Sequence, residues 1–226
     1  MKFRGFADSA TLEQEMCDLL TETFGQEQPR PHAVMLAGGG TPLAIYEALG
    51  RQNLRAGRSL HVMYSDDRLV PVTDPGSNYG NSQAMLAALR LPAERVIRVR
   101  GELAPGPAAQ AYGDQLADFA GRGGTFALGV LGIGSDGHTA SLFSLAAAQR
   151  TDRLTLAVER PDFLRVSVTR SVLSRFHHLV ILATGEGKRE ILETLRDAPE
   201  SIPSGVALAG LNVEVWTDLV IGDRDA

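Results

Sequence analysis

Residues 126–143 have the sequence FALGVLGIGSDGHTASLF, in which an apolar run leads into a loop with three glycines, an acid and a histidine. A nearly continuous apolar run is typical of a strand in a parallel sheet, because helices cover both faces of such a sheet. Similar runs recur at 32–37, 60–64, 95–99, 154–158, 165–169, 178–183 and 213–216. Segments of helical character lie between them, at 11–24, 42–49, 77–89, 108–119 and 186–195. This alternation predicts an α/β fold with a mostly parallel central sheet.

The composition is that of a folded protein. The chain has 226 residues, 44% hydrophobic and 22% charged, so we expect a single domain over residues 1–226. Its net charge of −5 argues against nucleic-acid binding, which depends on clustered Lys and Arg. No apolar run approaches the ~20 residues of a membrane span, and the first residues lack the apolar centre of a signal peptide. The lone cysteine, Cys17, cannot form an internal disulfide. We therefore expect a cytoplasmic protein, without a membrane partner, that is a monomer or a weak homodimer.

The loop after residues 126–131 carries the side chains best suited to acid–base chemistry. Gly132, Gly134 and Gly137 allow it to fold tightly around Asp136 and His138. An imidazole exchanges protons near neutral pH, so His138 can take a proton from water and return it to a leaving group. Asp136 can orient the ring, as a carboxylate does behind a catalytic histidine. We predict both as catalytic residues and expect no serine nucleophile, because the chain has no Gly-x-Ser-x-Gly elbow.

A second glycine-rich loop follows the run 32–37. Gly38, Gly39, Gly40 and Thr41 stand between this run and an expected helix. Glycines let the backbone approach a ligand closely, and a helix N-terminus offers free N–H groups and the positive end of a dipole. These residues therefore predict a phosphate site, with a plain strand-to-helix turn as the alternative. The spacing matches neither GxGxxG nor GxxxxGK[ST], so we expect no nucleotide.

Two further strand ends carry charged side chains. Asp66 and Arg68 follow the run 60–64, and Lys188 falls in the first turn of the expected helix 186–195. Ligands of open α/β sheets bind at the carboxyl ends of strands, and arginine can donate two hydrogen bonds to a phosphate. A lysine near a helix N-terminus is unfavourable unless a ligand anion compensates it. We predict that these three residues bind substrate, with solvated surface charges as the alternative. We expect no metal, because adjacent acids such as Asp66 and Asp67 point apart on an extended segment.

Taken together, the four segments resemble the 6-phosphogluconolactonase family. The matching strings are AGGGTP at 37–42, DDRLVPVTDPGSNYG at 66–80, LGIGSDGHTASLF at 131–143 and ATGEGKREIL at 183–192. The family commonly has serine at the position of Gly40. The resemblance implies a modified Rossmann-type α/β/α sandwich. It also implies hydrolysis of 6-phospho-D-glucono-1,5-lactone to 6-phosphogluconate in the oxidative pentose phosphate pathway.

In a reaction of this kind His138 would activate the water that opens the lactone and then protonate the departing ring oxygen. No redox cofactor and no metal are needed for it, so we expect none. One alternative is a glucosamine-6-phosphate deaminase/isomerase, whose relatives carry further acids after the Asp-Gly-His step, whereas no carboxylate follows His138 here until Asp152. Another is a non-catalytic sugar-phosphate sensor, but the segment before residue 32 is acidic and lacks the basic character of a DNA-binding element.

Overall fold

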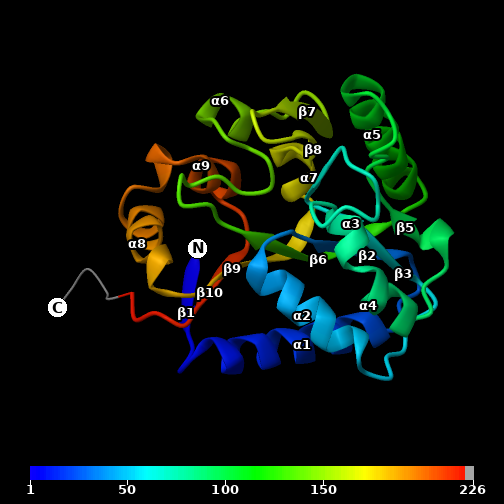
Figure 1. Ribbon diagram of the computed structural model, residues 1–226, viewed down its shortest axis with the longest axis horizontal. Coiled ribbons are helices and arrows are strands. Elements are labelled where there is room, and N and C mark those ends of the chain that lie inside the picture. The colour runs from blue at the N-terminus through cyan, green and yellow to red at the C-terminus, as the bar shows by residue number, and fades with distance from the viewer. Residues whose placement is uncertain (222–226) are drawn as a thin grey trace.

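A seven-stranded sheet forms the centre of the molecule, with helices on both faces (Figure 1). The computed structural model describes residues 1–221, so residues 222–226 of the expected domain lie outside the described part. In chain order the strands are β1 (Lys2–Gly5), β2 (His32–Leu36), β3 (Leu60–Tyr64), β5 (Val96–Ile97), β6 (Thr125–Gly132), β9 (Phe176–Ala183) and β10 (Val213–Thr217). Their spatial order is β1-β10-β9-β6-β2-β3-β5, and every neighbouring pair is parallel. The predicted α/β/α fold with a mostly parallel central sheet is confirmed, whereas the single domain stays a prediction.

The longer helices begin at residues suited to a helix start. Asp8 accepts a 2.7 Å hydrogen bond from the amide of Thr11 at the start of α1, and Pro105 opens α5.

Within residues 1–221 no helix is both long and apolar enough to cross a membrane. The helices are α1 (Ser9–Gly25), α2 (Gly40–Gly50), α3 (Asn78–Asn81), α4 (Gln83–Ala88), α5 (Pro105–Gly121), α6 (Leu145–Ala148), α7 (Arg170–Leu173), α8 (Arg189–Asp197) and α9 (Pro203–Leu208), with 3-10 turns η1 (Ala93–Arg95), η2 (Glu186–Lys188) and η3 (Pro199–Ser201).

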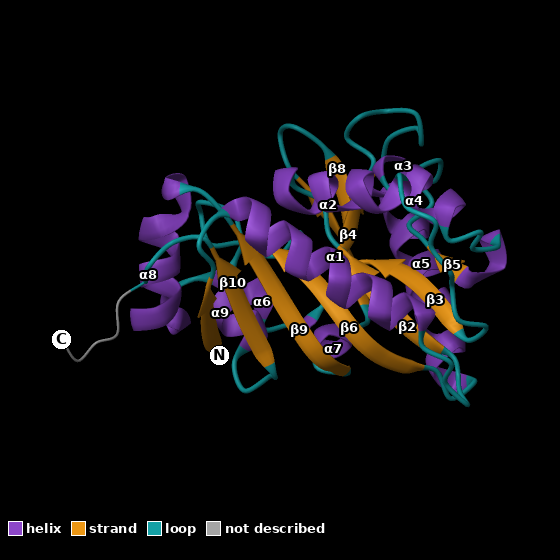
Figure 2. Ribbon diagram, turned by 90° about the horizontal axis from the view of Figure 1, so that it is seen from below, coloured by secondary structure: helices purple, strands orange, loops and turns teal. Residues whose placement is uncertain are grey.

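The sheet separates two hydrophobic cores. Successive side chains of a strand point to opposite faces, and along β2 Ala33 and Met35 enter one core while Val34 and Leu36 enter the other. Helices α1, α2 and α4 cover the second core, and α5, α7, α8 and α9 cover the first (Figures 1 and 2). Because both faces are buried, the central strands are apolar almost throughout, which is why the sequence pattern identified them.

Three strands form a separate antiparallel sheet, in the order β4-β8-β7, above the carboxyl ends of the central strands. They are β4 (Asp66–Arg68), β7 (Thr155–Glu159) and β8 (Leu164–Val168). The runs 154–158 and 165–169 were therefore correctly predicted as strands but do not join the central sheet. Only residues 160–163 connect β7 with β8, and so short a connection permits antiparallel pairing alone.

Several other elements differ from the sequence prediction. The helix expected over 77–89 is divided at Ser82 into α3 and α4, and the strand expected over 95–99 is reduced to β5. Strand β1 precedes the first predicted strand and pairs only with β10 at the sheet edge. Its four residues, KFRG, alternate in character and lack the apolar run of a central strand, so the pattern did not identify it.

Candidate active site

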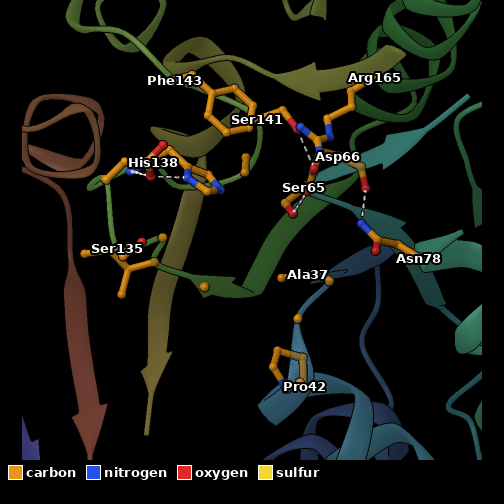
Figure 3. A pocket seen from close by; sticks show the side chains of 18 of the residues that line it. Ala37, Pro42, Ser65, Asp66, Asn78, Ser135, His138, Ser141, Phe143 and Arg165 are labelled. Carbon is orange, nitrogen blue, oxygen red and sulfur yellow. Dashed lines mark hydrogen bonds and ion pairs between the residues drawn. The ribbon is translucent and has the colours of Figure 1, made fainter. Parts of the chain in front are cut away.

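A pocket of about 660 Å³ lies where the carboxyl ends of β2, β3, β6 and β9 face the small sheet (Figure 3). In open α/β sheets this end of the strands is the usual place of a ligand. The topology thus brings together four loops that are far apart in sequence. All residues predicted for the site line this pocket: Gly38, Gly39, Gly40, Thr41, Asp66, Arg68, Asp136, His138 and Lys188.

His138 and Asp136 form a hydrogen-bonded pair on the wall of the pocket. The ring Nδ1 of His138 lies 2.5 Å from Oδ1 of Asp136, and the same oxygen accepts from the His138 amide at 3.2 Å. Partial burial favours a higher pKa for Asp136, but the hydrogen bonds from His138 outweigh burial and lower that pKa below its ordinary value. An ionised carboxylate only accepts hydrogen bonds, so Nδ1 is the donor, and in the neutral imidazole Nε2 then has the free lone pair. The imidazole is thereby arranged to act as a base through Nε2.

Two glycines permit the turn that holds this pair. A Cβ on Gly134 would lie 2.2 Å from Nδ1 of His138, so any side chain there would displace the ring. Gly137 has φ of +78°, a region that L-residues rarely adopt. The amide of Gly134 donates to the carbonyl of His138 at 2.9 Å and closes the turn. The ring of His138 packs on Phe143, with 4.3 Å between the ring centroids.

The start of α2 forms another wall of the pocket. Gly39 is the residue before the helix, has φ of +114° and provides no side-chain cap. Because the first amides of a helix have no intrahelical acceptor, the N–H groups of Gly40 and Thr41 are available to a ligand. The hydroxyl of Thr41 lies 2.7 Å from that of Thr184 at the end of β9. Free amides at a helix N-terminus are a geometry that suits an anion, and the phosphate site expected from the glycines stays a prediction.

Asp66 and Asp67 point to opposite sides of β4, as the extended segment predicts. Asp66 lines the pocket, and its carboxylate accepts from Ser141 Oγ at 2.6 Å and from Ser65 Oγ at 2.8 Å. The carboxylate of Asp67 accepts from the backbone amides of Arg68, Asn78 and Tyr79. Burial raises the pKa of Asp67 to about 6, although these amide hydrogen bonds act in the opposite direction. Both carboxylates are thus occupied by hydrogen bonds within the protein.

The two predicted cations reach the pocket from different sides. Arg68 Nη1 donates to Asn78 Oδ1 at 2.7 Å and to the carbonyl of Gly76 at 3.2 Å. Lys188, half-buried at the end of η2 and immediately before α8, donates from Nζ to the carbonyl of Ile133 at 2.6 Å. A carbonyl leaves the charge of the ammonium group uncompensated, so the lysine remains attractive to an anion.

Other lining residues were not identified from the sequence. They include Asn78, Ser141, Phe143, Arg160, Arg165 and Thr184. Arg165 places a charge at the first position of the run 165–169, which was the one signal available for it. The role of Ser141 depends on Asp66, which lies in another loop, and no local pattern in the sequence predicts that contact. Within residues 1–221 no three His, Cys, Asp or Glu side chains form a cluster able to hold a metal ion.

Comparison with known proteins agrees with this geometry. Residues 7–216 match the family of glucosamine-6-phosphate isomerases/6-phosphogluconolactonase. The 6-phosphogluconolactonase of Aggregatibacter actinomycetemcomitans is 33% identical over 180 residues, which cover 76% of this chain and 77% of that protein. The crystal structure of 6-phosphogluconolactonase from Thermotoga maritima superimposes with a TM-score of 0.76 and 25% identity, covering 95% of this chain and 97% of the other. A crystal structure described as devB protein superimposes with a TM-score of 0.81 and 28% identity, covering 96% and 95% of the two chains.

Proposed function

The chain belongs to the glucosamine-6-phosphate isomerase/6-phosphogluconolactonase family, and we propose that it hydrolyses 6-phospho-D-glucono-1,5-lactone to 6-phosphogluconate with His138 as the general base. This activity makes it an enzyme, a lactone hydrolase of carbohydrate metabolism. The observation that carries the proposal is the pair of Asp136 and His138 in one pocket with the start of α2, Arg68 and Lys188. One part of the pocket offers a base, and another offers donors and positive charge to a phosphate.

The reaction proceeds in two steps at the lactone carbonyl carbon. Nε2 of His138 takes a proton from water while the water oxygen bonds to this carbon and the carbonyl oxygen becomes an oxyanion. The oxyanion then re-forms the carbonyl, the bond to the ring oxygen breaks, and the ring oxygen takes the proton from Nε2. Asp136 holds the ring by Nδ1 and stabilises the imidazolium that exists between the two steps. Water is consumed, and the product acid ionises in solution.

The phosphate of the substrate would be held away from the reacting carbon. The amides of Gly40 and Thr41, the Thr41 hydroxyl, Arg68 and Lys188 supply hydrogen bonds and positive charge to it. Binding energy from a remote group of this kind positions the reacting carbon near the base. We therefore assign these residues mainly to affinity and orientation, and the pair of Asp136 and His138 to the chemical step.

Replacement of the base tests the assignment. We expect His138→Ala to lower kcat by about 10²- to 10⁴-fold, the range for loss of a general base. Asp136→Asn should also lower kcat, since an amide no longer fixes the ring in the required tautomer. The matched control is His177→Gln, which changes an exposed histidine at the opposite end of β9. The measurement is opening of freshly generated 6-phosphogluconolactone, corrected for spontaneous hydrolysis. Wild-type kcat in a folded His138→Ala protein would refute the role of His138.

The same preparation distinguishes the alternative activities. A deaminase would release ammonia from glucosamine 6-phosphate, and a sensor would bind sugar phosphates without turnover. We expect neither result, because the curated relatives bear the name of the lactonase and the pocket holds a base beside an anion site. Chelation of metals should leave the lactonase rate unchanged, since His138 supplies the base and hydrolysis transfers no electrons.

The remaining partner assignments are proposals as well. We propose a cytoplasmic enzyme that is a monomer or a weak homodimer and binds neither nucleic acid nor membranes. The net charge of −5 argues against nucleic-acid binding, and the buried single thiol of Cys17 fits a reducing compartment. Sedimentation at micromolar concentration tests the oligomeric state directly.

A further inference from the structure

Two arginines lie opposite each other in the small sheet. Arg68 of β4 and Arg165 of β8 are partners in the antiparallel register, so their side chains leave the same face of the sheet. Both line the pocket. Like charges directly opposite each other destabilise an antiparallel pair. Two arginines at this position therefore call for an explanation in terms of what the pocket binds.

Arg68 is directed toward the start of α2. Its Nη1 donates to Asn78, and the Asn78 side chain lies where a Cβ on Gly38 would stand, at 2.2 Å from that position. Its Nε is buried and has no hydrogen-bond partner within residues 1–221. Arg68 therefore belongs to the end of the pocket assigned above to the phosphate.

Arg165 instead lies near Phe143, the aromatic ring on which His138 packs. Its guanidinium carbon lies 5.3 Å from the ring centroid of Phe143, and the same ring contacts the guanidinium of Arg160 at 4.4 Å and the ring of His138 at 4.3 Å between centroids. Figure 3 shows Arg165, Phe143 and Ser141 on the same side of the pocket, away from Ala37 and Pro42 at the start of α2. The two opposed arginines thus lie at different ends of the pocket.

The charge of Arg165 is only partly compensated within the protein. Its side chain is 8% exposed, and its acidic partner is Asp162, at 2.6 Å from Nη2 and 55% exposed. Asp66, the acid on the same face of the small sheet, already accepts from two hydroxyls. A buried guanidinium is costly unless its charge is balanced, and a partner largely in solvent balances it weakly. A negative charge that forms on a ligand in the pocket would compensate the remaining positive charge of Arg165.

We propose that Arg165 binds the lactone carbonyl oxygen and stabilises the negative charge that this oxygen gains during hydrolysis. This inference rests on the proposed function, because that reaction creates such a charge beside His138. The substrate carbonyl is neutral, the tetrahedral intermediate is an oxyanion, and the product is a carboxylate. Arg165 then interacts more strongly with the transition state than with the substrate, so its contribution falls on kcat.

Steady-state kinetics of Arg165→Met and Arg165→Lys test the proposal, with inorganic phosphate as a competitive inhibitor. We expect Arg165→Met to lower kcat by about 10²-fold, the usual loss for one oxyanion donor, with KM and the inhibition constant of phosphate within about twofold of wild type. Arg165→Lys should lower kcat at least about fivefold, because a single ammonium does not replace the guanidinium fork. Lys188→Met should give the opposite pattern, a raised KM and a raised phosphate inhibition constant. Arg175→Met, which removes an exposed arginine lying against Phe126 outside the pocket, serves as the matched control.

Three outcomes would overturn the proposal. One is a kcat within twofold of wild type in folded Arg165→Met, with only the melting temperature lowered, as expected of a purely structural arginine. Another is a rise of KM and phosphate inhibition constant together, which would place Arg165 in the phosphate site. Should Arg165→Met fail to fold, Arg165→Lys decides alone, and wild-type kcat refutes the inference. A wild-type protein without lactonase activity would instead refute the proposed function.

Discussion

At the scale of single residues, the two glycines at the start of α2 have different structural roles. Gly39 has φ of +114°, which a side chain would strain, whereas Gly40 has ordinary helical geometry. A Cβ built on Gly40 meets no atom within 4 Å. Gly39 is therefore required by the backbone, while Gly40 leaves room at the anion site for a side chain.

We expect Gly40→Ser to strengthen substrate binding. The added hydroxyl would lie at the first turn of α2, where it can donate to the phosphate, and serine is also a better helix former than glycine. The expected result is a fall in KM of about two- to tenfold at unchanged kcat, the value of one added hydrogen bond. Gly39→Ser is the matched variant and should raise KM and lower the melting temperature. An unchanged or higher KM in folded Gly40→Ser would contradict the placement of the phosphate.

The residues that the sequence could identify are those that follow strands. His138, Asp136 and Lys188 stand in loops directly after apolar runs, so the parallel sheet alone places them at one edge. The contacts of Asp66 and Arg165 were not predictable in this way. Ser141 reaches Asp66 from a loop 75 residues away, and the side of the pocket that Arg165 faces depends on the register of β4 with β8. Such contacts follow from tertiary packing, which no local pattern encodes.

At the scale of elements, Asp67 fastens the short helix α3 to β4. Its carboxylate accepts from the amides of Asn78 and Tyr79, so it holds the segment whose Asn78 side chain supports Arg68. Burial raises the pKa of Asp67 from 3.8 to about 6. A group with a raised pKa in the folded state contributes stability that is complete below its unfolded value and is lost as the pH rises through its folded value.

The stability of the protein should therefore depend on pH through Asp67. The free energy of unfolding of wild type, measured relative to Asp67→Asn, should fall by about 2–3 kcal/mol between about pH 4 and pH 7. Urea unfolding of both proteins at several pH values provides the measurement, and subtraction removes the other titrating groups they share. If the difference in unfolding free energy between wild type and Asp67→Asn stayed constant over this interval, the pKa of Asp67 would not be raised in the folded protein.

Helix α9 depends on an arginine from another element. Arg170 donates from Nη1 to the carbonyls of Val206 and Ala207 and from Nη2 to that of Ala209, and so caps the end of the helix. At the other end of α9, the amide of Ser204 donates to the carbonyl of Gly137 at 2.8 Å. The arginine thus supports, through α9, the turn that carries His138.

Arg170→Met should weaken both the fold and the reaction. We expect a loss of about 1–3 kcal/mol in unfolding free energy, because three helix-end carbonyls lose their donor. We also expect a fall in kcat of a few fold from a looser turn at His138. Arg122→Met provides a control, since Arg122 forms an exposed ion pair with Asp118 that is worth about 0.5 kcal/mol or less. Equal effects of the two substitutions would contradict the capping role.

The elements were predictable to different degrees for a physical reason. Strands β2, β3, β6 and β9 are buried on both faces, so their apolar runs alone identify them. By contrast, α6, α7 and α9 span only four to six residues each, too few for helical periodicity to emerge. Strand β4 consists of the charged residues Asp66–Arg68, and only pairing with β8 makes it a strand.

At the scale of the whole molecule, the charge of the pocket is opposite to that of the chain. The net charge of the chain is −5, whereas the pocket at the end of the sheet has a net charge of +1, from four cations and three acids: Arg68, Arg160, Arg165, Lys188, Asp66, Asp136 and Asp162. A cleft can concentrate positive potential on an acidic protein and attract an anionic substrate that the remaining surface repels. The fold achieves this by collecting cations from β4, β7–β8 and η2 around the start of α2.

Binding of the phosphorylated lactone should therefore weaken as salt is added. We expect KM to rise a few fold between about 0.02 M and 0.2 M ionic strength, because screening shortens the Debye length from about 20 Å to below 10 Å. The value of kcat should hold constant, since the chemical step occurs inside the pocket at fixed distances from His138. Lys188→Met should show a smaller rise of KM than wild type over the same interval, because less positive charge remains to be screened. If salt instead lowered kcat and left KM unchanged, the cations would act on the chemical step and not on substrate capture.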